Sequence, residues 1–443
     1  MRALTPLRPA LLLALCALPA LGQDAPAPDA PAPEAPAPEA PAPEAPAGDA
    51  PLVLRGRVHV GDGAVLEDGA VVIREGKVAL VARWAAVSFP AGAQVVAGEG
   101  LEITPGLVEA SGRAGIREAS YAEQASEVVP ETRVRDAVDL KTQDWERLVR
   151  RGITAVYVAA DPASVIGSQG CLLKTAGPRR VVLEASGVKA TLGPETWSRG
   201  GANRPPHGGR PTHLSRRPTT LMGNVWVFRE AFHLARQAAA PDAAQEVLRE
   251  VLAGNVPLRI QARSQSEIEA AFRLAAEQGV EFTLERADEV CRLLDLIARR
   301  KTPVIYGPIG DDDGALGTPR RLAALKLPFC LSAGGLSGEA DLWGQALLAV
   351  RYGLEPSAAL TAVTAAPARI LGVADRVGRV AKGLDADLVV WTGAPLAATS
   401  SPGLVLIDGA KAFGRLAPKP AAAAKQGEEE APSPPEKNPQ RFK

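Results

Sequence analysis

Histidine and arginine side chains concentrate in residues 199–217, which read RGGANRPPHGGRPTHLSRR. The segment holds His207 and His213, two of the four histidines of the chain. The arginines around them are Arg199, Arg204, Arg210, Arg216 and Arg217. Two imidazoles could contribute to a metal site, whereas guanidinium groups repel a metal cation and bind carboxylate or phosphate groups. The composition therefore favours an anion here and leaves a metal site at the two histidines as the alternative.

Other reactive side chains are scattered. His59 falls on an alternating, strand-like segment, and His233 falls within REAFHLAR, a helical pattern in which it packs or faces solvent. The three aspartates at 311–313 are more typical of a solvated turn than of a Ca²⁺ site. No Gly-x-Ser-x-Gly elbow, phosphate-binding Gly-Lys-Ser/Thr loop or Cys/His nucleophile pair is recognisable.

The bulk composition excludes some partners. The formal net charge is +0 and the pI about 6.9, so no global field favours nucleic acid or an acidic membrane. Cys171, Cys291 and Cys330 each sit in an apolar context without a CxxC pair, which predicts free buried thiols over a structural zinc site. A single disulfide between two of these cysteines is the alternative.

Both chain ends are typical of segments outside the fold. Residues 1–22 form a signal peptide pattern: Arg2 and Arg8 precede a short apolar run that ends in Ala-Leu-Gly, too short to remain as a transmembrane anchor. This predicts an exported protein, periplasmic or secreted. Residues 23–51 repeat APAPD and APAPE units as a polyproline linker, and residues 417–443 form a disordered tail.

The remaining segments predict an α/β fold with two parts. Residues 52–104 and 376–416 hold alternating strands separated by glycine-rich turns, which predicts one small β-sandwich built from both chain ends. Residues 105–375 alternate strands with helices over a length typical of a (β/α)8, TIM-like barrel. Chemistry in such barrels takes place at the carboxyl ends of the strands.

Four motifs carry a resemblance to a known family. ITPGLVEASGRAG at residue 103 resembles the first barrel strand of the amidohydrolase superfamily, and GITAVYVAADPASVIGSQGCLLK resembles a segment of its imidazolonepropionase-like members. MGNVWVFREAFHLAR and GRVAKGLDADLVVWTGAPL are similar to a helix and to the closing sequence of that group. The resemblance covers about residues 52–415 and implies hydrolysis of cyclic amides and related C–N bonds by a divalent metal held mostly by histidines.

The positions that match the family's ligands hold other residues. Ser111 and Arg113 replace the paired histidines of the first strand, where Glu109 stands at the usual aspartate. Gln261 and Arg263 replace those of the fifth strand, and Arg286 replaces the histidine of the sixth. Gly334, or Ala333 in a register shifted by one, stands at the catalytic aspartate of the eighth. Glu195 matches more weakly a Gly-Glu-Asn turn after the fourth strand.

These replacements predict no metal, no cofactor and no catalytic residue that can be named. Arg113, Arg263 and Arg286 should converge on the barrel axis, either paired with acids such as Glu109, Glu285 or Glu195, or open to an anion. Glu195, His207, Arg210 and His213 are the candidate residues of the mouth loop.

We therefore expect a catalytically inactive relative with a binding or interaction role, its partner an anionic small molecule in the barrel mouth. The alternative is an active hydrolase on non-peptide C–N bonds that uses an unrecognised site. A scaffold that works outside the cytoplasm through its linker and surface is the third hypothesis. The sequence leaves the ligand and the oligomeric state open.

Overall fold

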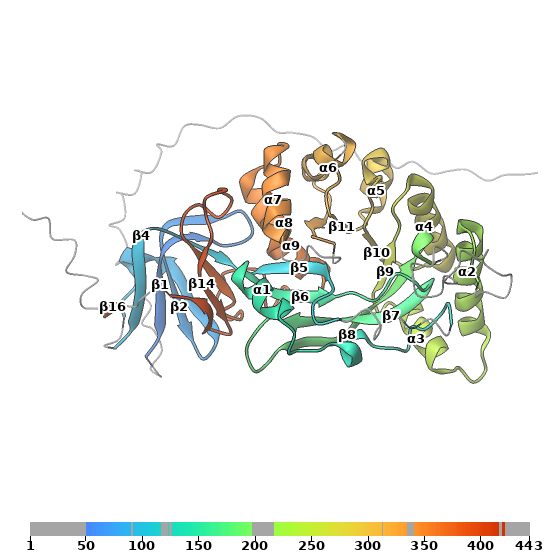
Figure 1. Ribbon diagram of the computed structural model, residues 1–443, viewed down its shortest axis with the longest axis horizontal. Helices are drawn as coiled ribbons and strands as arrows, with labels where there is room; N and C mark the ends of the chain where they lie inside the picture. The colour runs from blue at the N-terminus through green and yellow to red at the C-terminus, as the bar shows by residue number, and fades with distance from the viewer. Residues whose placement is uncertain are drawn as a thin grey trace, which may run out of the picture. The chain divides into compact units, whose positions relative to one another are not determined.

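The structure is a computed structural model that describes residues 50–89, 92–116, 123, 126–196, 217–311, 313–334, 341–415 and 419–420 (Figure 1). All of these residues belong to one compact unit, Ala42–Lys443. The predicted signal peptide and most of the predicted linker and tail lie outside the described residues, as does the segment 197–216 with its two histidines.

One sheet joins the two ends of the described chain. Its strands are β1 (Leu52–His59), β2 (Val65–Arg74), β3 (Lys77–Arg83), β4 (Gln94–Pro105), β13 (Leu388–Trp391), β14 (Pro402–Ile407), β15 (Ala410–Gly414) and β16 (Lys419–Pro420). They follow the order β15-β14-β13-β4-β1-β2-β3, with β16 beside β4. Leu388 pairs with Pro105 and Trp391 with Glu102 in antiparallel register. The prediction that both ends build one small β structure is confirmed.

The alternation of side chains along each strand explains why this sheet packs an apolar cluster on each of its two faces. Along β1, Leu54 and Val58 pack into one buried apolar cluster, while Val53 packs into another. Successive strand residues point to opposite faces, so one strand can serve both clusters. A two-residue turn at Glu75 and Gly76, both with positive φ, connects β2 to β3, as tight hairpins require.

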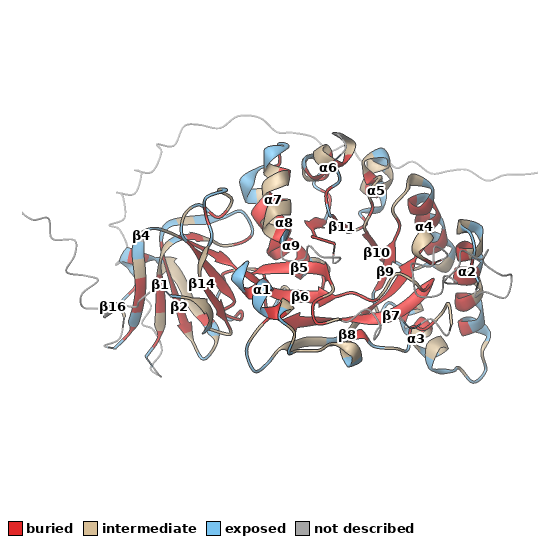
Figure 2. Cartoon of the chain, viewed as in Figure 1, coloured by how far each residue is buried: buried red, intermediate tan, exposed pale blue. Residues whose placement is uncertain are grey.

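A second sheet of eight strands forms the barrel wall. Its strands are β5 (Leu107–Gly112), β6 (Ile153–Val158), β7 (Ile166–Lys174), β8 (Val181–Thr191), β9 (Leu258–Gln261), β10 (Phe282–Glu285), β11 (Val304–Tyr306) and β12 (Phe329–Leu331). They lie in chain order from β5 to β12. Figure 2 shows these strands largely buried, apart from the first half of β8, with helices around them exposing their outer faces. The predicted TIM-like barrel is confirmed.

Strict alternation of strands and helices fails at one place in this wall. β7 runs antiparallel to both β6 and β8, while every other neighbouring pair of the sheet is parallel. The links at residues 159–165 and 175–180 are too short for a crossover helix, which needs a dozen residues or more. The strand predicted at GCLLKTA is therefore the middle strand of an antiparallel run.

Helices surround the barrel wall from β8 onward. The described α-helices are α1 (Asp144–Arg150), α2 (Leu221–Gln237), α3 (Ala243–Leu252), α4 (Gln265–Gln278), α5 (Leu294–Arg300), α6 (Asp313–Ala324), α7 (Leu342–Arg351), α8 (Pro356–Val363) and α9 (Ala365–Ile370). Short 3-10 turns occupy Trp84–Ala86, Val134–Ala137, Pro194–Thr196 and Val290–Arg292. Local signals set the helix ends: Ser264 and Glu267 form a capping box on α4, and Gly279 closes it in a left-handed conformation.

A buried ionic group, which we call the junction cluster, joins the barrel to the first sheet. Lys174, at the end of β7, is 0% exposed. Its Nζ lies 2.8 Å from Asp385 Oδ2, 3.0 Å from Asp387 Oδ1 and 2.6 Å from Asp408 Oδ1. The three carboxylates come from segments flanking β13 and β15. One barrel lysine thus fastens the C-terminal strands to the barrel.

Two further predictions concern cysteines and membranes. Cys171, Cys291 and Cys330 are free thiols, two of them buried and Cys291 half-buried. Burial raises the pKa of Cys171 to about 12, so that thiol stays protonated at neutral pH. Among the described residues, every helix is too short or too polar to cross a bilayer.

Candidate functional site

The residues at the predicted ligand positions all follow, or end, strands of the barrel sheet. Ser111 lies in β5 and Arg113 just after it, and Gln261 ends β9 with Arg263 two residues beyond. Arg286 follows β10 directly, and Gly334 lies just past β12. The strands β5, β9, β10 and β12 run in one direction, so these positions share the carboxyl end of the barrel.

The buried carboxylate of Glu109 connects the two edges of the barrel sheet. It is 0% exposed and accepts hydrogen bonds from the backbone N–H of Ser111 on its own strand. From the opposite edge it accepts the Ser332 hydroxyl, at 2.5 Å, and the Ala333 backbone N–H, at 2.9 Å. Glu109 therefore joins β5 to the end of β12 and stabilises closure of the barrel.

A second group of contacts gathers around Glu195 in the turn after β8. Its Oε1 accepts from Gln261 Nε2 at 3.1 Å and lies 3.5 Å from Arg263 NH1. Arg263 Nε also donates to Asp288 Oδ2 at 2.7 Å. Glu195, one of the three acids proposed as partners of the barrel arginines, does lie beside one of them, Arg263, and beside a second ligand position, Gln261. Glu195 Oε2, in contrast, is buried and has no hydrogen-bond partner in the described part of the chain.

Arg286 and Gly334 meet between β10 and β12. Arg286 NH1 donates to the Gly334 carbonyl oxygen at 3.2 Å, while its Nε is buried without a hydrogen-bond partner. Arg286 also has a φ of 49°, an uncommon conformation for a residue with a side chain and one that recurs at functional positions. Gly334 has a φ of 79°, and a Cβ there would overlap the ring of Pro308. An aspartate does not fit at Gly334 in this backbone.

The barrel interior holds a buried ionic group that the sequence analysis missed, here called the interior cluster. Arg259 on β9 and Lys189 on β8 both contact Glu285 on β10, Arg259 through Nε and Lys189 with Nζ 3.3 Å from Oε2. Arg259 also donates to the Ala110 carbonyl oxygen at 2.7 Å and stacks 3.6 Å above the Tyr157 ring. Arg259 lies two residues before Gln261, so strand alternation could have placed it on the same face.

The pKa values of this cluster follow from burial and charge. Burial lowers the pKa of Lys189, although Glu285 opposes that change. Burial acts to raise the pKa of Glu285, but the charges of Arg259 and Lys189 outweigh it and the pKa is lowered. Burial raises the pKa of Tyr157 to about 12. Glu285 is therefore ionised and compensates part of the charge of the two interior cations. Its contacts are to Lys189 and Arg259, so the pairing of Glu285 with a mouth arginine that the sequence suggested is not formed.

The other predicted residues have mixed outcomes. Ser111 is buried, and Arg113 is half-buried and engaged in a contact. Arg217 pairs with Glu127 and Glu230, and the exposed His233 of α2 faces solvent as predicted. His59 on β1 bonds Glu102 at 2.5 Å, far from the barrel mouth. His207, Arg210 and His213 lie outside the described residues, together with Arg199, Arg204 and Arg216.

The donor set at the ligand positions does not fit a divalent metal. It comprises one hydroxyl, one amide, three guanidinium groups and a glycine. A divalent ion requires imidazole, thiolate or carboxylate lone pairs, and a guanidinium offers none. Within the described ranges, no three His, Cys, Asp or Glu side chains converge in a way that could hold a metal ion. We therefore derive no reaction step through a metal at this site.

Comparisons with known proteins agree with this architecture. The Amidohydrolase family profile matches residues 313–419. Amidohydrolase tasK from Hapsidospora irregularis is 26% identical over 395 residues, which are 78% of this chain and 40% of that relative. The chain thus spans less than half the length of that relative.

Solved structures show the same likeness. The crystal structure of an amidohydrolase from Thermotoga maritima MSB8 superposes with a TM-score of 0.73 at 25% identity, covering 82% of this chain and 100% of that one. The A. niger ochratoxinase structure has a TM-score of 0.52 at 16% identity, covering 82% and 96%, and supports the fold alone. Barrel, joined sheet, matched profile and relatives agree: this chain has an amidohydrolase family domain at residues 313–419 and the fold of amidohydrolase superfamily structures.

Proposed function

We propose that this amidohydrolase-fold protein does not hydrolyse its ligand by the metal-dependent route and that its barrel mouth is a binding site for a small polar molecule with an anionic group. The donor set at the ligand positions carries the proposal, because three of its members are arginines. Gly334 adds to it, since the backbone there excludes the aspartate that would accept the proton of an attacking water.

Two buried polar atoms at the mouth support a binding role. Among the residues that the structure describes, Arg286 Nε is a donor without a partner and Glu195 Oε2 is an acceptor without one. Buried polar groups are rarely left unsatisfied, and unsatisfied ones recur where a ligand completes them. A molecule that offers an anionic group to Arg286 and a donor to Glu195 would satisfy both. The internal pairing of Arg263 with Asp288 and Glu195 keeps that side chain in place beside them.

The alternative, an active hydrolase on C–N bonds, draws on the relatives, whose names describe amidohydrolases. The two functions differ in a direct measurement. Elemental mass spectrometry of the purified protein, dialysed without chelator, should detect far less than one zinc, manganese or iron per chain. One or two bound ions per chain, together with turnover of a panel of cyclic amides, would establish the hydrolase and overturn our proposal.

Ligand binding has its own test. A thermal-shift screen of small carboxylates, phosphates and sulfates should identify anions that raise the melting temperature. Arg286→Gln and Arg113→Ala should abolish that rise, because each removes a cation at the mouth. Arg229→Gln serves as the control, since Arg229 pairs with Glu277 on the outer surface. A rise that persists in Arg286→Gln would contradict the mouth as the binding site.

We also propose export, on the composition of residues 1–22. The chain would act outside the cytoplasm after cleavage behind Gly22. Expression of the full-length gene followed by amino-terminal sequencing of the extracytoplasmic protein tests this directly. Gln23 as the first residue supports export, and an intact Met1 in the cytoplasmic fraction contradicts it.

A further inference from the structure

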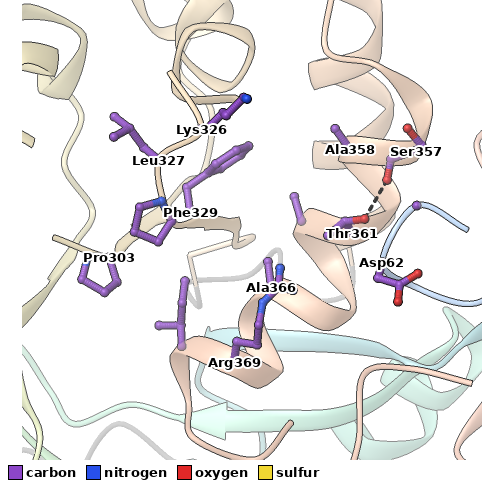
Figure 3. Close-up of a pocket in the computed structure, with 14 residues that line it drawn as sticks. Asp62, Pro303, Lys326, Leu327, Phe329, Ser357, Ala358, Thr361, Ala366 and Arg369 are labelled. Atoms are coloured by element: carbon purple, nitrogen blue, oxygen red, sulfur yellow. Dashed lines mark hydrogen bonds between the residues drawn. The ribbon is translucent and has the colours of Figure 1, made fainter. Parts of the chain in front are cut away.

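A cavity of about 660 Å³ lies at the amino ends of the last barrel strands, opposite the mouth. Pro303 precedes β11, and Lys326, Leu327 and Phe329 lead into β12, so these residues form one wall. Residues of α8 and α9 form the other wall, and the turn after β1 completes the rim (Figure 3). We call this space the amino-end cavity. Its volume lies in the range of small-molecule sites, roughly 300–1,000 Å³.

The wall of the amino-end cavity is largely apolar and firmly packed. Leu327 and Phe329 are each 9% exposed, and Ala366 on α9 is 7% exposed. Ser357 and Thr361 on α8 add hydroxyl groups, and Thr361 Oγ1 donates to the Ser357 carbonyl oxygen at 2.9 Å (Figure 3). Such a wall accepts the apolar body of a ligand, and the Ser357 hydroxyl at its edge can bind a polar group.

Two cations line this cavity without a partner. Within the described part of the chain, the side chains of Arg369 and Lys326 form no hydrogen bond or ion pair. In Figure 3 the Arg369 side chain runs along α9 toward Ala366, inside the cavity. The mouth arginine Arg263, in contrast, contacts two carboxylates. The cations at this end therefore keep their capacity for an external anion.

The surroundings raise the positive potential further. In a βα barrel the helices run opposite to the strands, so the C-termini of α5, α6 and α7 reach the amino ends of the strands. Arg320 near the end of α6 packs beside Gly353, just after α7, which brings these helix ends together. The basic residues at these ends are Arg299, Arg300, Lys301, Arg320, Arg321 and Arg351. Basic side chains at a helix C-terminus also complement the helix dipole, and this alone accounts for their presence there. It does not account for the cavity that lies beside them.

The carboxylate of Asp62, which also lines the cavity, is already engaged. Asp62 Oδ1 accepts from the Ala64 backbone N–H at 3.2 Å, and its Oδ2 lies 3.9 Å from Arg379 NH1. Asp62 therefore leaves the charge of Arg369 and Lys326 largely uncompensated. A bound anion would compensate it.

We propose that the amino-end cavity binds a small organic anion with an apolar body, such as an aryl or alkyl carboxylate, phosphate or sulfonate. Arg369 and Lys326 hold the anionic group, and the wall formed by Leu327, Phe329 and Ala366 accepts the apolar body. This site is separate from the mouth, at the other end of the barrel, and does not depend on the function proposed for the mouth.

The experiment compares three probes on the full chain by fluorescence and calorimetry. Anilinonaphthalene sulfonate carries both an aromatic body and an anion, N-phenylnaphthylamine carries only the body, and inorganic phosphate only the anion. We expect one sulfonate probe to bind per folded chain, with the other two bound at least about tenfold more weakly, because one charge-assisted contact contributes that much. Equal binding of phosphate, or of the neutral probe, would contradict an amphipathic anion as the ligand.

Matched variants locate the site. Arg369→Gln should weaken sulfonate binding by about tenfold or more, and Lys326→Gln by less, because lysine binds an anion as a point charge. Arg351→Gln removes a neighbouring cation outside the lining and should leave binding nearly unchanged. Arg263→Gln at the mouth should have no effect. An equal loss of sulfonate affinity in Arg351→Gln and Arg369→Gln would show that the probe binds a diffuse basic surface, and this would overturn the proposal.

A variant that fills the cavity gives an independent test. Ser357 is exposed at the start of α8, so Ser357→Trp should fold and place an indole in the space. Sulfonate binding should then be lost while circular dichroism and melting temperature stay near those of the parent. Retained binding in Ser357→Trp, or tight binding to vesicles rich in anionic lipid that the sulfonate does not displace, would overturn the cavity as the site.

Discussion

The junction cluster and the interior cluster are both buried, yet their charges are balanced in opposite ways. In the junction cluster, one lysine contacts three aspartates. In the interior cluster, Arg259 and Lys189 share one glutamate. Counting buried side chains alone, the first has more carboxylates than cations and the second more cations than carboxylates; the partly exposed Lys77 and Arg376 add positive charge beside Asp385. Both fasten segments that are far apart in the sequence.

The difference shows which part of the superfamily pattern this chain keeps. Asp385 and Asp387 belong to GLDADLVVW, a motif that resembles the family's closing sequence. The barrel strands keep their apolar pattern but carry arginine, lysine and glutamine at the positions facing the mouth and interior. The chain thus has a buried ionic group that joins its two sheets, and it has arginine and glutamine at positions that the resemblance matches to metal ligands. Three experiments separate these roles.

The largest effect should come from Lys174→Met. This change leaves Asp385, Asp387 and Asp408 without their shared buried cation, and removing one partner of a buried ion pair costs about 3–5 kcal/mol. The free energy of unfolding should fall by about that amount, measured by urea denaturation with tryptophan fluorescence and circular dichroism. Asp385 keeps Lys77 and Arg376 as partners in this variant, so the loss falls mainly on Asp387 and Asp408.

Lys77→Met is the matched control for that variant. Lys77 Nζ contacts the same Asp385 at 3.0 Å, but its side chain is 54% exposed. Exposed ion pairs contribute about 1 kcal/mol or less, so this variant should unfold close to the parent. An equal loss of unfolding free energy in Lys174→Met and Lys77→Met would show that burial does not decide how much an ion pair of this cluster stabilises the fold.

Glu285→Gln should have the next largest effect. Glutamine keeps an oxygen that can accept from Arg259 Nε, but it leaves two buried cations without a counter-charge, which costs about 3 kcal/mol. Urea denaturation measures the loss. Glu277→Gln, at an exposed pair with Arg229 on the outer surface, is the control and should change stability by less than about 1 kcal/mol. An unchanged midpoint in Glu285→Gln would mean that Lys189 is neutral in the folded protein.

The smallest effect concerns pH and the junction cluster. Burial raises the pKa of Asp387 to about 6, even though Lys174 opposes it. In the unfolded chain an aspartate has a pKa of about 3.9, so the native state binds more protons between these values. The free energy of unfolding should therefore fall as pH rises from about 4 to 6, by up to about 2 kcal/mol. Asp387→Asn should lose that part of the pH dependence, as measured by urea denaturation across the window.

Neighbouring groups do not reproduce this trend. Burial opposes the ionised form of Asp385, but hydrogen bonds from Lys174 and Lys77 lower its pKa to about 2, so its contribution is lost only as pH falls below about 4. The lowered pKa of Lys189 makes stability rise with pH in the alkaline range, because the unfolded state binds the extra proton there. Asp68→Asn, at a surface pair with Arg55, should keep the slope of the parent. If Asp387→Asn kept the parent's change of unfolding free energy with pH, a group other than Asp387 would be responsible for that change.

The fold was predictable to a large extent because its signals are local. Alternating apolar residues identified strands at both ends of the chain, and the joined sheet confirms them. Helical patterns such as SEIEAAFRLAAEQG, with Ser264 as cap and Gly279 as stop, identified α4. The direction of β7 was not predictable from its own pattern, because a strand reads alike in both directions and only the short links around it forbid a crossover.

The candidate site was predictable by position but not by contact. The carboxyl ends of β5, β9, β10 and β12 do carry the residues assigned to them, and Arg263 does pair with Glu195. Glu285, one of the acids proposed as partners of the mouth arginines, pairs with Arg259 and Lys189, whereas Arg286 bonds the Gly334 carbonyl oxygen. Lys189 and Arg259 were overlooked because neither occupies a matched ligand position.

By itself, the sequence determined the strand and helix types, the barrel, the superfamily and the absence of histidine from the matched ligand positions, since these depend on residue identity and short-range pattern. Only the tertiary structure decided which charges meet. Lys174 joins aspartates 211, 213 and 234 residues further along the chain, and Glu109 bonds Ser332 across 223. Ion pairs form between side chains that the fold brings within a few ångströms, and separation along the chain does not encode that distance.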